Sequence, residues 1–291
     1  MQEERSRDSN LHKVEMSKGE FRRFSDFIYD QCGVKLPPGK RTMLTVRLNK
    51  RLRALNLTSF RKYFEYVSGP NGRAGELVRM IDVVTTNKTD FFREPKHFEY
   101  LKRHALPDLL GPGMGGGRKR LNIWSAGCSS GEEPYTLAMV LSEVFERVKE
   151  GDYGILATDI STRVLAIAKQ GIYPERVIEP IPSMLKRKYL MRGKGTQEGL
   201  FRMVPELRNR VSYQRLNLNK GRKFELKTLM DIIFCRNVII YFDRETQIRL
   251  FEKFYEQLVP GGYLFIGHSE TLHGINDRFV PVTVAVYRKP K

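Results

Sequence analysis

The sequence predicts a doubly wound α/β domain with a small inserted antiparallel β-subdomain, preceded by a small all-α domain. The first observation is the stretch Leu121–Tyr135, where a short apolar run ends in small residues and a helical pattern follows at once. Strand, glycine turn and helix in this order are typical of the first crossover of such a sheet. A second buried-strand pattern at Tyr153–Ile160 repeats the rhythm. The third observation is a series of four amphipathic helical patterns within residues 16–84.

The four N-terminal patterns predict short helices with clear boundaries. The first begins at Ser17 and ends at Gly33, and the third begins after Ser59, because Ser caps helix starts and Gly ends helices. Each pattern repeats apolar residues at a spacing that buries one helix face. These residues are Phe21, Phe24, Phe27 and Ile28; Leu44, Leu48, Leu52 and Leu55; Phe60, Tyr63, Phe64 and Val67; and Leu77, Met80, Ile81 and Val84. We therefore expect a helical domain over residues 16–84.

The second helix also carries Arg47, Lys50 and Arg53 along one flank. The whole chain of 291 residues has a formal net charge of +18. Such an excess steers a protein towards polyanions or acidic protein surfaces, and charge alone does not separate nucleic acid from an acidic protein. The flank is either a docking surface for such a partner or an ordinary solvated face.

An interdomain segment is expected over residues 85–117. Thr85–Glu94 is polar and then aromatic, and its cap-type residues precede another helical pattern. A plain linker would have little use for the adjacent Phe91 and Phe92. Gly111–Gly117 is rich in glycine and predicts a flexible connection, which places the second domain at residues 118–291.

The second domain continues the α/β rhythm with one interruption. Residues 172–210 are rich in proline and basic residues, and we expect the inserted β-subdomain at about residues 186–210. Strand patterns resume afterwards, and the alternation in the last one suits an antiparallel edge. The patterns are strands at Val211–Leu218, Asp231–Cys235, Tyr263–Ile266 and Phe279–Tyr287, with a helix after Asp243.

Composition excludes several classes of protein. No apolar run approaches the roughly 20 residues that span a bilayer, and the polar segment Met1–Asn10 is no signal peptide, so no membrane insertion is expected. Cys32, Cys128 and Cys235 are widely spaced and form no CxxC pair. A disulfide framework or metal site is therefore not expected, and the cytoplasm is the natural compartment.

The turn after the first strand of the sheet indicates the ligand. Gly127 and Gly131 would let the backbone approach a ligand at the carboxyl end of the strand. Glu132 and Glu133 would repel a pyrophosphate but suit a cationic ligand, and Asp159 ends the next strand, where an acidic side chain can bind a ribose diol. A positively charged adenosine ligand is S-adenosylmethionine. The alternative is that the two glutamates only complement the helix dipole.

With these pieces in order, the chain resembles the CheR family of chemotaxis receptor methyltransferases. The resemblance runs from about Phe21 to Tyr287. It implies a helical domain joined to a Rossmann-like S-adenosylmethionine methyltransferase domain. Family members methylate specific glutamates on the cytoplasmic helices of chemoreceptors, forming γ-glutamyl methyl esters, and the resemblance suggests a monomer. The matching stretches are Thr85–Glu94 (TTNKTDFFRE), Trp124–Tyr135 (WSAGCSSGEEPY), Ala157–Ser161 (ATDIS), Phe234–Asp243 (FCRNVIIYFD) and Pro260–Glu270 (PGGYLFIGHSE).

The resemblance also implies a set of site residues. A glutamate carboxylate is ionised at pH 7, so methyl transfer needs no general base and depends on positioning. Arg93 and Tyr241 are the candidate catalytic residues, although Arg93 or Arg236 could brace the cofactor's own carboxylate and Tyr241 could belong to the core. Glu133 is the alternative to Glu132. The implied cofactor residues are Asn87, Thr89, Arg93, Glu132, Asp159, Asn217, Leu218, Arg236 and Asn237.

Two surfaces are implied as partner sites. Acidic receptor helices would dock on the flank formed by Arg47, Lys50 and Arg53. In some family members the inserted subdomain captures a short C-terminal receptor peptide by strand addition, and the loop Met191–Leu200 looks like the loop of those members.

Two alternative functions are a nucleic-acid methyltransferase and a binding module without turnover. Amino-methylating nucleic-acid methyltransferases carry an Asn/Asp-Pro-Pro-aromatic turn where this chain has Arg236–Ile239, and cytosine-type enzymes need a Pro before the cysteine, where Phe234 stands. Nucleic acid is therefore not expected as a partner. A binding module without turnover stays open as a further alternative, although the intact set of Asn87, Arg93, Asp159 and Asn237 argues against it.

Overall fold

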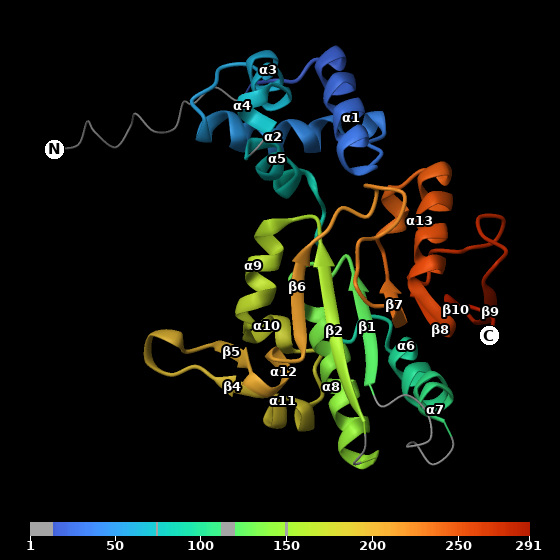
Figure 1. Ribbon diagram of the computed structural model, residues 1–291. Helices are drawn as coiled ribbons and strands as arrows, with labels where there is room; N and C mark the ends of the chain where they lie inside the picture. Colours follow the sequence, from blue (N-terminus) through green and yellow to red (C-terminus); the bar gives the residue numbers. More distant parts are fainter. Residues whose placement is uncertain (1–13, 74, 112–119, 149–150) are drawn as a thin grey trace. The chain divides into compact units, whose positions relative to one another are not determined.

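The computed structural model describes residues 14–73, 75–111, 120–148 and 151–291. It divides into two compact units, residues 1–85 and 86–291 (Figure 1). Of the predicted glycine connection, residues 112–117 lie outside the described part. The rest of the predicted interdomain segment, from residue 86 on, belongs to the second unit.

The first unit is helical, as the four amphipathic patterns predict. Ser17 and Glu20 form a reciprocal capping box at the start of α1, and Gly33 ends that helix in the left-handed region at φ 75°. Ser59 caps α3 as expected. The elements are α1 (Lys18–Cys32), the 3₁₀ turn η1 (Pro38–Lys40), α2 (Arg41–Ala54), α3 (Phe60–Ser68), α4 (Pro70–Arg73) and α5 (Glu76–Val84).

The core of this unit combines aromatic packing with an ion pair between the buried Glu76 and the partly exposed Arg51. Phe24 of α1 stacks on Tyr63 of α3 with ring centroids 5.9 Å apart. Arg51 of α2 donates two hydrogen bonds of 2.8 Å to the Glu76 carboxylate of α5. The Tyr63 hydroxyl donates a third, of 2.9 Å, to the same carboxylate. The network joins three helices, so the predicted helical domain is packed around it.

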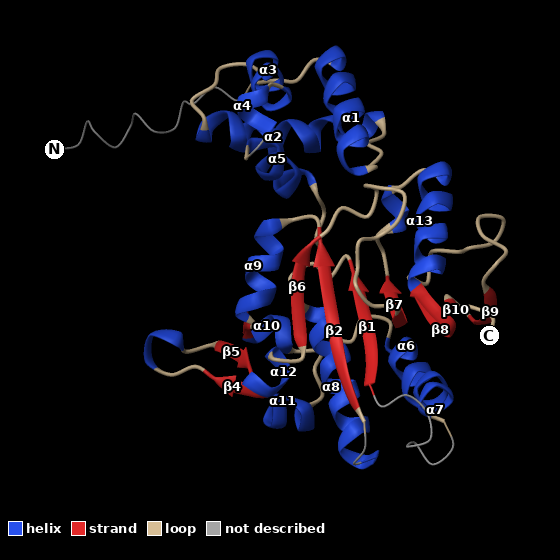
Figure 2. Cartoon of the chain, in the orientation of Figure 1, coloured by secondary structure: helices blue, strands red, loops and turns tan. Residues whose placement is uncertain are grey.

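The second unit is built on a seven-stranded sheet in the order β6-β2-β1-β7-β8-β10-β9 (Figure 2). The pairs from β6 to β8 are parallel, and β10 is antiparallel to both of its neighbours, β8 and β9. This confirms the predicted fold class. The strands are β1 (Arg120–Ala126), β2 (Asp152–Asp159), β6 (Val211–Arg215), β7 (Met230–Cys235), β8 (Leu258–Ile266), β9 (Val280–Thr283) and β10 (Val286–Arg288).

Helices cover both faces of the sheet. Because successive strand residues point to opposite faces, each strand contributes to two separate buried clusters. Ile123 of β1 belongs to one buried cluster and the adjacent Trp124 to the other. Leu137 on α8 contributes to the first cluster and Phe254 on α13 to the second. The helices of the unit are α6 (Pro95–Tyr100), the π-helical η2 (Leu101–Ala105), α7 (Leu106–Leu110), α8 (Glu132–Val148), α9 (Thr162–Gln170), α10 (Glu175–Ile178), α11 (Ser183–Tyr189), α12 (Pro205–Arg208) and α13 (Arg244–Gln257).

The inserted subdomain is a three-stranded antiparallel sheet in the order β3-β5-β4. Its strands are β3 (Ile172–Pro174), β4 (Leu190–Arg192) and β5 (Leu200–Met203), with the 3₁₀ turn η4 (Gly195–Gln197) between the last two. The first strand therefore precedes the expected range of 186–210. Three residues ending in proline are too short to show a strand period, which explains the difference.

The C-terminal end also differs in detail from expectation. The pattern Phe279–Tyr287 predicts one strand, but the structure has the two strands β9 and β10. Ala285 lies between them in the left-handed region at φ 58° and reverses the chain. A non-glycine residue with positive φ leaves no turn signal in the sequence. In the described part of the chain, no helix has both the length and the apolar character required to cross a bilayer.

Candidate active site

The predicted site segments converge at the carboxyl ends of four neighbouring parallel strands. In the order β6-β2-β1-β7, the loop with Asn217 follows β6, Asp159 ends β2, the glycine turn follows β1, and Arg236 follows β7. The arrowheads of β6, β2 and β1 point to the same edge of the sheet in Figure 2. This is the edge where doubly wound sheets bind ligands.

The glycine turn between β1 and α8 is anchored to β2. The N–H groups of Gly127 and Cys128 both donate to the Thr158 carbonyl, at 2.8 and 2.9 Å. Gly127 has φ 86° and Gly131 has φ 100°. A Cβ on Gly131 would lie 2.7 Å from the Tyr173 hydroxyl. The glycines are therefore required by the protein's own packing, in addition to the predicted approach to a ligand.

Asp159 is held between two backbone segments. One carboxylate oxygen accepts the Ser129 N–H and the other accepts the Ser161 N–H, both at 2.9 Å. The residue is 8% exposed. Asp159 therefore fixes the turn after β1 to the segment that follows β2.

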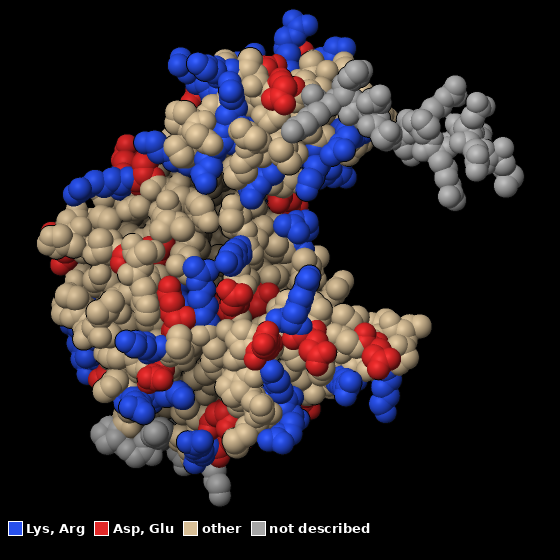
Figure 3. Space-filling view, turned by 180° about the vertical axis from the view of Figure 1, so that it is seen from behind, with Lys and Arg blue, Asp and Glu red and all other residues tan. Residues whose placement is uncertain are grey.

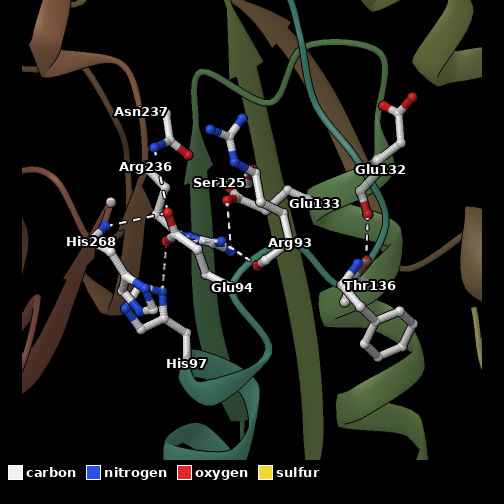
Figure 4. Close-up of polar contacts among 12 residues, drawn as sticks. Arg93, Glu94, His97, Ser125, Glu132, Glu133, Thr136, Arg236, Asn237 and His268 are labelled. Carbon is white, nitrogen blue, oxygen red and sulfur yellow. Dashed lines mark hydrogen bonds and ion pairs between the residues drawn. The ribbon is translucent and has the colours of Figure 1, made fainter. Parts of the chain in front are cut away.

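The structure separates the two glutamates at the start of α8, whose side chains point in different directions in Figure 4. Glu133 accepts a 2.7 Å hydrogen bond from the Ser125 hydroxyl and lies 3.4 Å from an Arg236 guanidinium nitrogen. Within the described part of the chain, the one side chain that donates a hydrogen bond to the Glu132 carboxylate is the neighbouring Ser130, whose hydroxyl lies at 2.8 Å. Burial raises the pKa of Glu132 to about 6. Glu132 is thus the glutamate that Arg236 does not neutralise.

Arg236 lies at the centre of a buried ion-pair cluster (Figure 4). Its guanidinium donates to Glu94 at 3.2 and 3.3 Å, pairs with Glu133, and also donates to the Arg93 carbonyl. Its side chain is 2% exposed. The predicted contact of Arg236 with the cofactor stays a prediction, and the structure gives this guanidinium internal carboxylate partners. The half-buried Arg93 donates to the Lys88 carbonyl at 3.3 Å.

The segment with Asn87 and Thr89 packs on the glycine turn. The Ser129 hydroxyl donates to the Asn87 carbonyl at 2.9 Å, and Thr136 of α8 accepts the Phe92 N–H at 3.2 Å. Phe91 is 1% exposed. The adjacent phenylalanines therefore anchor residues 87–94 to the second unit, and Asn87, Thr89 and Arg93 are brought to the same edge as Asp159.

Two further acidic residues organise the site and were missed from the sequence. Glu94, at φ 56°, binds Arg236 and accepts the His268 N–H at 3.3 Å. Burial opposes its charge, but Arg236 and the neighbouring donors hold the pKa of Glu94 below its usual value. Glu270 accepts the N–H groups of Gly267, Asn237 and Ile240 at 2.6, 3.0 and 3.3 Å. Both glutamates end motifs that carried the family resemblance, but a motif does not reveal the partners.

Asn237 and Tyr241 occupy the turn that Glu270 fixes. Asn237 is in the left-handed region at φ 58°, and its side-chain amide lies 3.5 Å from a Glu94 oxygen. Tyr241 belongs to the 3₁₀ turn η5 (Ile239–Tyr241) and is half-buried. Its partial exposure favours the rim of the site over the alternative of a core position.

Glu94, His97 and His268 place possible metal-binding atoms within 4.8 Å of one another. Burial and the charge of Arg236 lower the pKa of His97 to about 3, so its imidazole is neutral. Arg236, however, donates twice to the same Glu94 carboxylate. A cation would compete with this guanidinium for one carboxylate, so the geometry favours an anchoring role for Glu94.

The three predicted docking residues on α2 do not share one environment. Lys50 and Arg53 are exposed, whereas Arg47 donates to the carbonyls of Val84 and Thr85 at the end of α5. Arg47 therefore caps a helix, because the last carbonyls of a helix lack intrahelical partners. Among the charged side chains on the face of the helical unit visible in Figure 3, the blue Lys and Arg predominate over the red Asp and Glu.

Comparison with known proteins decides the family. Residues 87–288 match the family model described as "CheR methyltransferase, SAM binding domain", and residues 19–85 match "CheR methyltransferase, all-alpha domain". The chain belongs to the CheR methyltransferase family. It is 39% identical over 277 residues to the chemotaxis protein methyltransferase of Borreliella burgdorferi, covering 95% of this chain and 96% of that one. It is 38% identical over 282 residues to that of Escherichia coli, covering 96% and 93%.

CheR membership confirms the predicted fold and cofactor. It also confirms the predicted activity, an S-adenosylmethionine-dependent protein-glutamate methyltransferase of chemotaxis. The probable chemotaxis protein methyltransferase of Rhizobium etli is similar as well, with 40% identity over 262 residues, 90% of this chain and 96% of that one. The nucleic-acid rival is thereby set aside.

Proposed function

We propose that this CheR enzyme binds S-adenosylmethionine across the carboxyl ends of β6, β2, β1 and β7, and methylates glutamates of chemoreceptors there. The proposed cofactor residues are Asn87, Thr89, Arg93, Glu132, Asp159, Asn217, Leu218 and Asn237, with Arg236 supporting the last of them. The observation that carries this assignment is a chain of hydrogen bonds through Ser129 and Asp159. Ser129 binds the Asn87 carbonyl and the Asp159 carboxylate, and the Asp159 carbonyl accepts the Leu216 N–H at 3.0 Å.

The chemistry of these residues fits the cofactor. Glu132 and Asp159 offer carboxylate acceptors for ribose hydroxyls, and acidic groups at the start of α8 disfavour a phosphate ligand. When bound, S-adenosylmethionine supplies an electrophilic methyl group on a sulfonium. The residues of the chain need only orient the two reactants and exclude water, because the acceptor carboxylate is already ionised.

Arg236 and Arg93 would have different roles in this arrangement. The Arg236 guanidinium is occupied by Glu94 and Glu133, so we assign it to holding the loop with Asn237 in place. Arg93 is half-buried and would brace a carboxylate, either the cofactor's or that of the substrate. In Figure 4 its guanidinium points away from Glu94. Tyr241 at the rim would help to close the site around the methyl group.

The receptor would be recognised through charge. The exposed Lys50 and Arg53 of α2 would attract the acidic helices of chemoreceptors, while Arg47 holds the end of α5. A soluble receptor domain would meet a monomer of this chain in the cytoplasm. We therefore attribute the net positive charge to receptor docking and not to nucleic-acid binding.

The inserted sheet is the second proposed receptor contact. β4 is an edge strand, and Met191 and Arg192 on it are exposed. An extended peptide could therefore add a strand beside β4, with its backbone N–H and C=O groups paired to that edge. The loop between β4 and β5, with Gly195 at φ 58° and Gly199 at φ 77°, would set the boundary of such a groove.

Cofactor binding by calorimetry tests the assignment of the site. Asp159→Asn removes the charge but keeps one acceptor oxygen, and we expect affinity for S-adenosylmethionine to fall by about 1–3 kcal/mol. The matched control is Asp152→Asn, at the other end of β2, where the carboxylate pairs with Arg120 and Arg210 at the surface. Equal affinity of the two variants would remove Asp159 from the site.

A further inference from the structure

The loop after β6 is held by several hydrogen bonds. The Leu216 N–H donates to the Asp159 carbonyl at 3.0 Å, which ties the start of the loop to β2. The Asn217 side-chain oxygen accepts the Asn219 N–H at 3.0 Å, and the Lys220 N–H donates to the Asn217 carbonyl at 3.1 Å. The loop is therefore a compact turn, and it carries two of the proposed cofactor residues, Asn217 and Leu218.

A buried lysine from another element reaches this loop. Lys253 on α13 is 5% exposed, and its ammonium donates to the carbonyls of Leu218 and Lys220, the latter at 3.3 Å. The ammonium also lies 4.9 Å from the centroid of the Phe224 ring. Lys253 thus connects the helix that covers one face of the sheet to the loop at its ligand-binding edge.

Burial of the Lys253 ammonium costs free energy that its contacts must offset. Burying an ammonium group is unfavourable, and its partners here are neutral carbonyls and an aromatic ring. Burial and the nearby charge of Arg249 lower the pKa of Lys253 to about 8. An apolar side chain would fill the same volume without this penalty, so the hydrogen bonds of the ammonium have an effect beyond packing.

We propose that Lys253 is a positioning residue for the cofactor, because it fixes the carbonyls of Leu218 and Lys220 and so holds the Asn217–Leu218 segment in its binding conformation. This inference rests on the proposed cofactor site. Lys253 itself touches the loop and not the reacting atoms, so its removal weakens cofactor binding and leaves turnover at saturating cofactor nearly unchanged.

The electrostatic surroundings make the contact sensitive to pH. The loop between β6 and β7 carries the charged residues Lys220, Arg222, Lys223, Glu225 and Lys227, and α13 contributes Arg249. The acidic residues of α13 near its end, Glu252 and Glu256, pair with Arg278. Among the described residues, the Lys253 ammonium contacts two carbonyls and the Phe224 ring and pairs with no carboxylate, and it loses its proton above pH about 8.

The first test compares cofactor affinity in two lysine variants. Lys289 provides a matched control, because its ammonium donates to the Tyr255 and Leu258 carbonyls, both at 2.8 Å, at the C-terminal end of α13 and not to the loop after β6. We expect Lys253→Met to raise the dissociation constant for S-adenosylmethionine roughly tenfold and Lys289→Met to leave it unchanged. Equal constants for the two variants would overturn the proposal.

The second test uses Lys253→Arg, which keeps the charge at all pH values used. The amino group of the cofactor itself titrates near pH ~8, so the useful quantity is the ratio of the two dissociation constants. From about pH 7 to about pH 9.5, the wild-type constant should rise relative to that of Lys253→Arg. A ratio independent of pH would contradict the proposal, even if Lys253→Met proves too unstable to measure.

The single tryptophan offers a spectroscopic readout of the same contact. Trp124 on β1 packs edge-on against Phe224 at 4.7 Å, and Phe224 lies beneath the Lys253 ammonium. Its fluorescence should change through the same pH range in the wild type and not in Lys253→Arg. Identical fluorescence profiles of the two proteins would count against the proposal.

Asn217→Ala separates this inference from the proposed function. If Asn217→Ala leaves cofactor affinity unchanged, the loop lies outside the cofactor site and both proposals fail. If Asn217→Ala weakens binding and Lys253→Met does not, the site stands and only the role of Lys253 is overturned.

Discussion

Each of the two units contains an arginine paired with glutamate, and the two pairs are built differently. In the helical unit, Arg51 donates two bonds of 2.8 Å to Glu76, and Tyr63 completes the carboxylate. In the methyltransferase unit, Arg236 is shared between Glu94 and Glu133 at 3.2 to 3.4 Å. The first arrangement is a closed bidentate pair, and the second connects three separate segments of the chain.

This difference indicates different purposes. The closed pair of Arg51 joins helices within a core and has no predicted ligand residue in it. The shared cluster of Arg236 joins the end of β7, the start of α8 and the segment before α6, each of which carries proposed cofactor residues. We infer that the first pair serves folding and the second serves the geometry of the site.

The largest expected effect is on the Arg236 cluster. Arg236→Met leaves two buried carboxylates without their cation, and we expect a loss of about 3–5 kcal/mol in the free energy of unfolding. Cofactor affinity should fall as well. Arg51→Met should destabilise the protein similarly but leave the cofactor affinity of the folded fraction unchanged. Denaturant titration and calorimetry on both variants check this, and a matching loss of cofactor affinity in Arg51→Met would remove the distinction.

The next effect concerns the two glutamates at the start of α8. Glu132→Gln should weaken cofactor binding by about 1–3 kcal/mol, because a diol loses a charged acceptor. Glu133→Gln should act mainly on stability, because Glu133 is bound to Arg236 and Ser125. Calorimetry on both variants measures this. Weaker binding in Glu133→Gln alone would reverse the assignment of the two residues.

Raising the pH through about 6 should lower the stability of the protein and strengthen its binding of the cofactor, and both effects should come from Glu132. Burial raises its pKa from 4.5 to about 6, so its contribution to stability is full below pH 4.5 and is lost as pH rises through about 6. The difference amounts to about 2 kcal/mol. Cofactor binding, which uses the ionised form, should instead weaken as pH falls below about 6. Both dependences should be absent from Glu132→Gln, measured by denaturant unfolding and calorimetry.

The smallest effect is expected on the helical unit. Charge reversal of Lys50 and Arg53 should slow receptor methylation several-fold at low salt without changing cofactor affinity. Arg61→Glu with Lys62→Glu is the matched control, since it makes the same charge change on the exposed side of α3. If both double variants slow methylation equally, the effect reflects net charge and not a docking surface on α2.

The fold could be predicted where the signal is local. The strand, glycine turn and helix of Leu121–Tyr135 lie in one stretch of sequence, and the structure confirms them as β1 and α8. The helix boundaries at Ser17, Gly33 and Ser59 are local in the same way. β3 was missed because three residues show no period.

The site could be predicted only in part, because its contacts are distant in sequence. Arg47 reads as a surface cation, but its acceptor carbonyls are 37 and 38 residues away. Arg236 meets Glu94 across 142 positions, so no spacing rule could have shown that this guanidinium is already occupied. The residue types predicted that these charged side chains have a role, but only the fold determines which of them pair with each other.

The central claim is tested most directly by methyl transfer from radiolabelled S-adenosylmethionine to membranes that contain chemoreceptors, followed by mild alkali. We predict label in the receptor that alkali releases as volatile methanol, because a glutamate methyl ester is hydrolysed under these conditions. Label that resists alkali, or that appears only when RNA or DNA is added, would contradict the assignment of glutamate as acceptor.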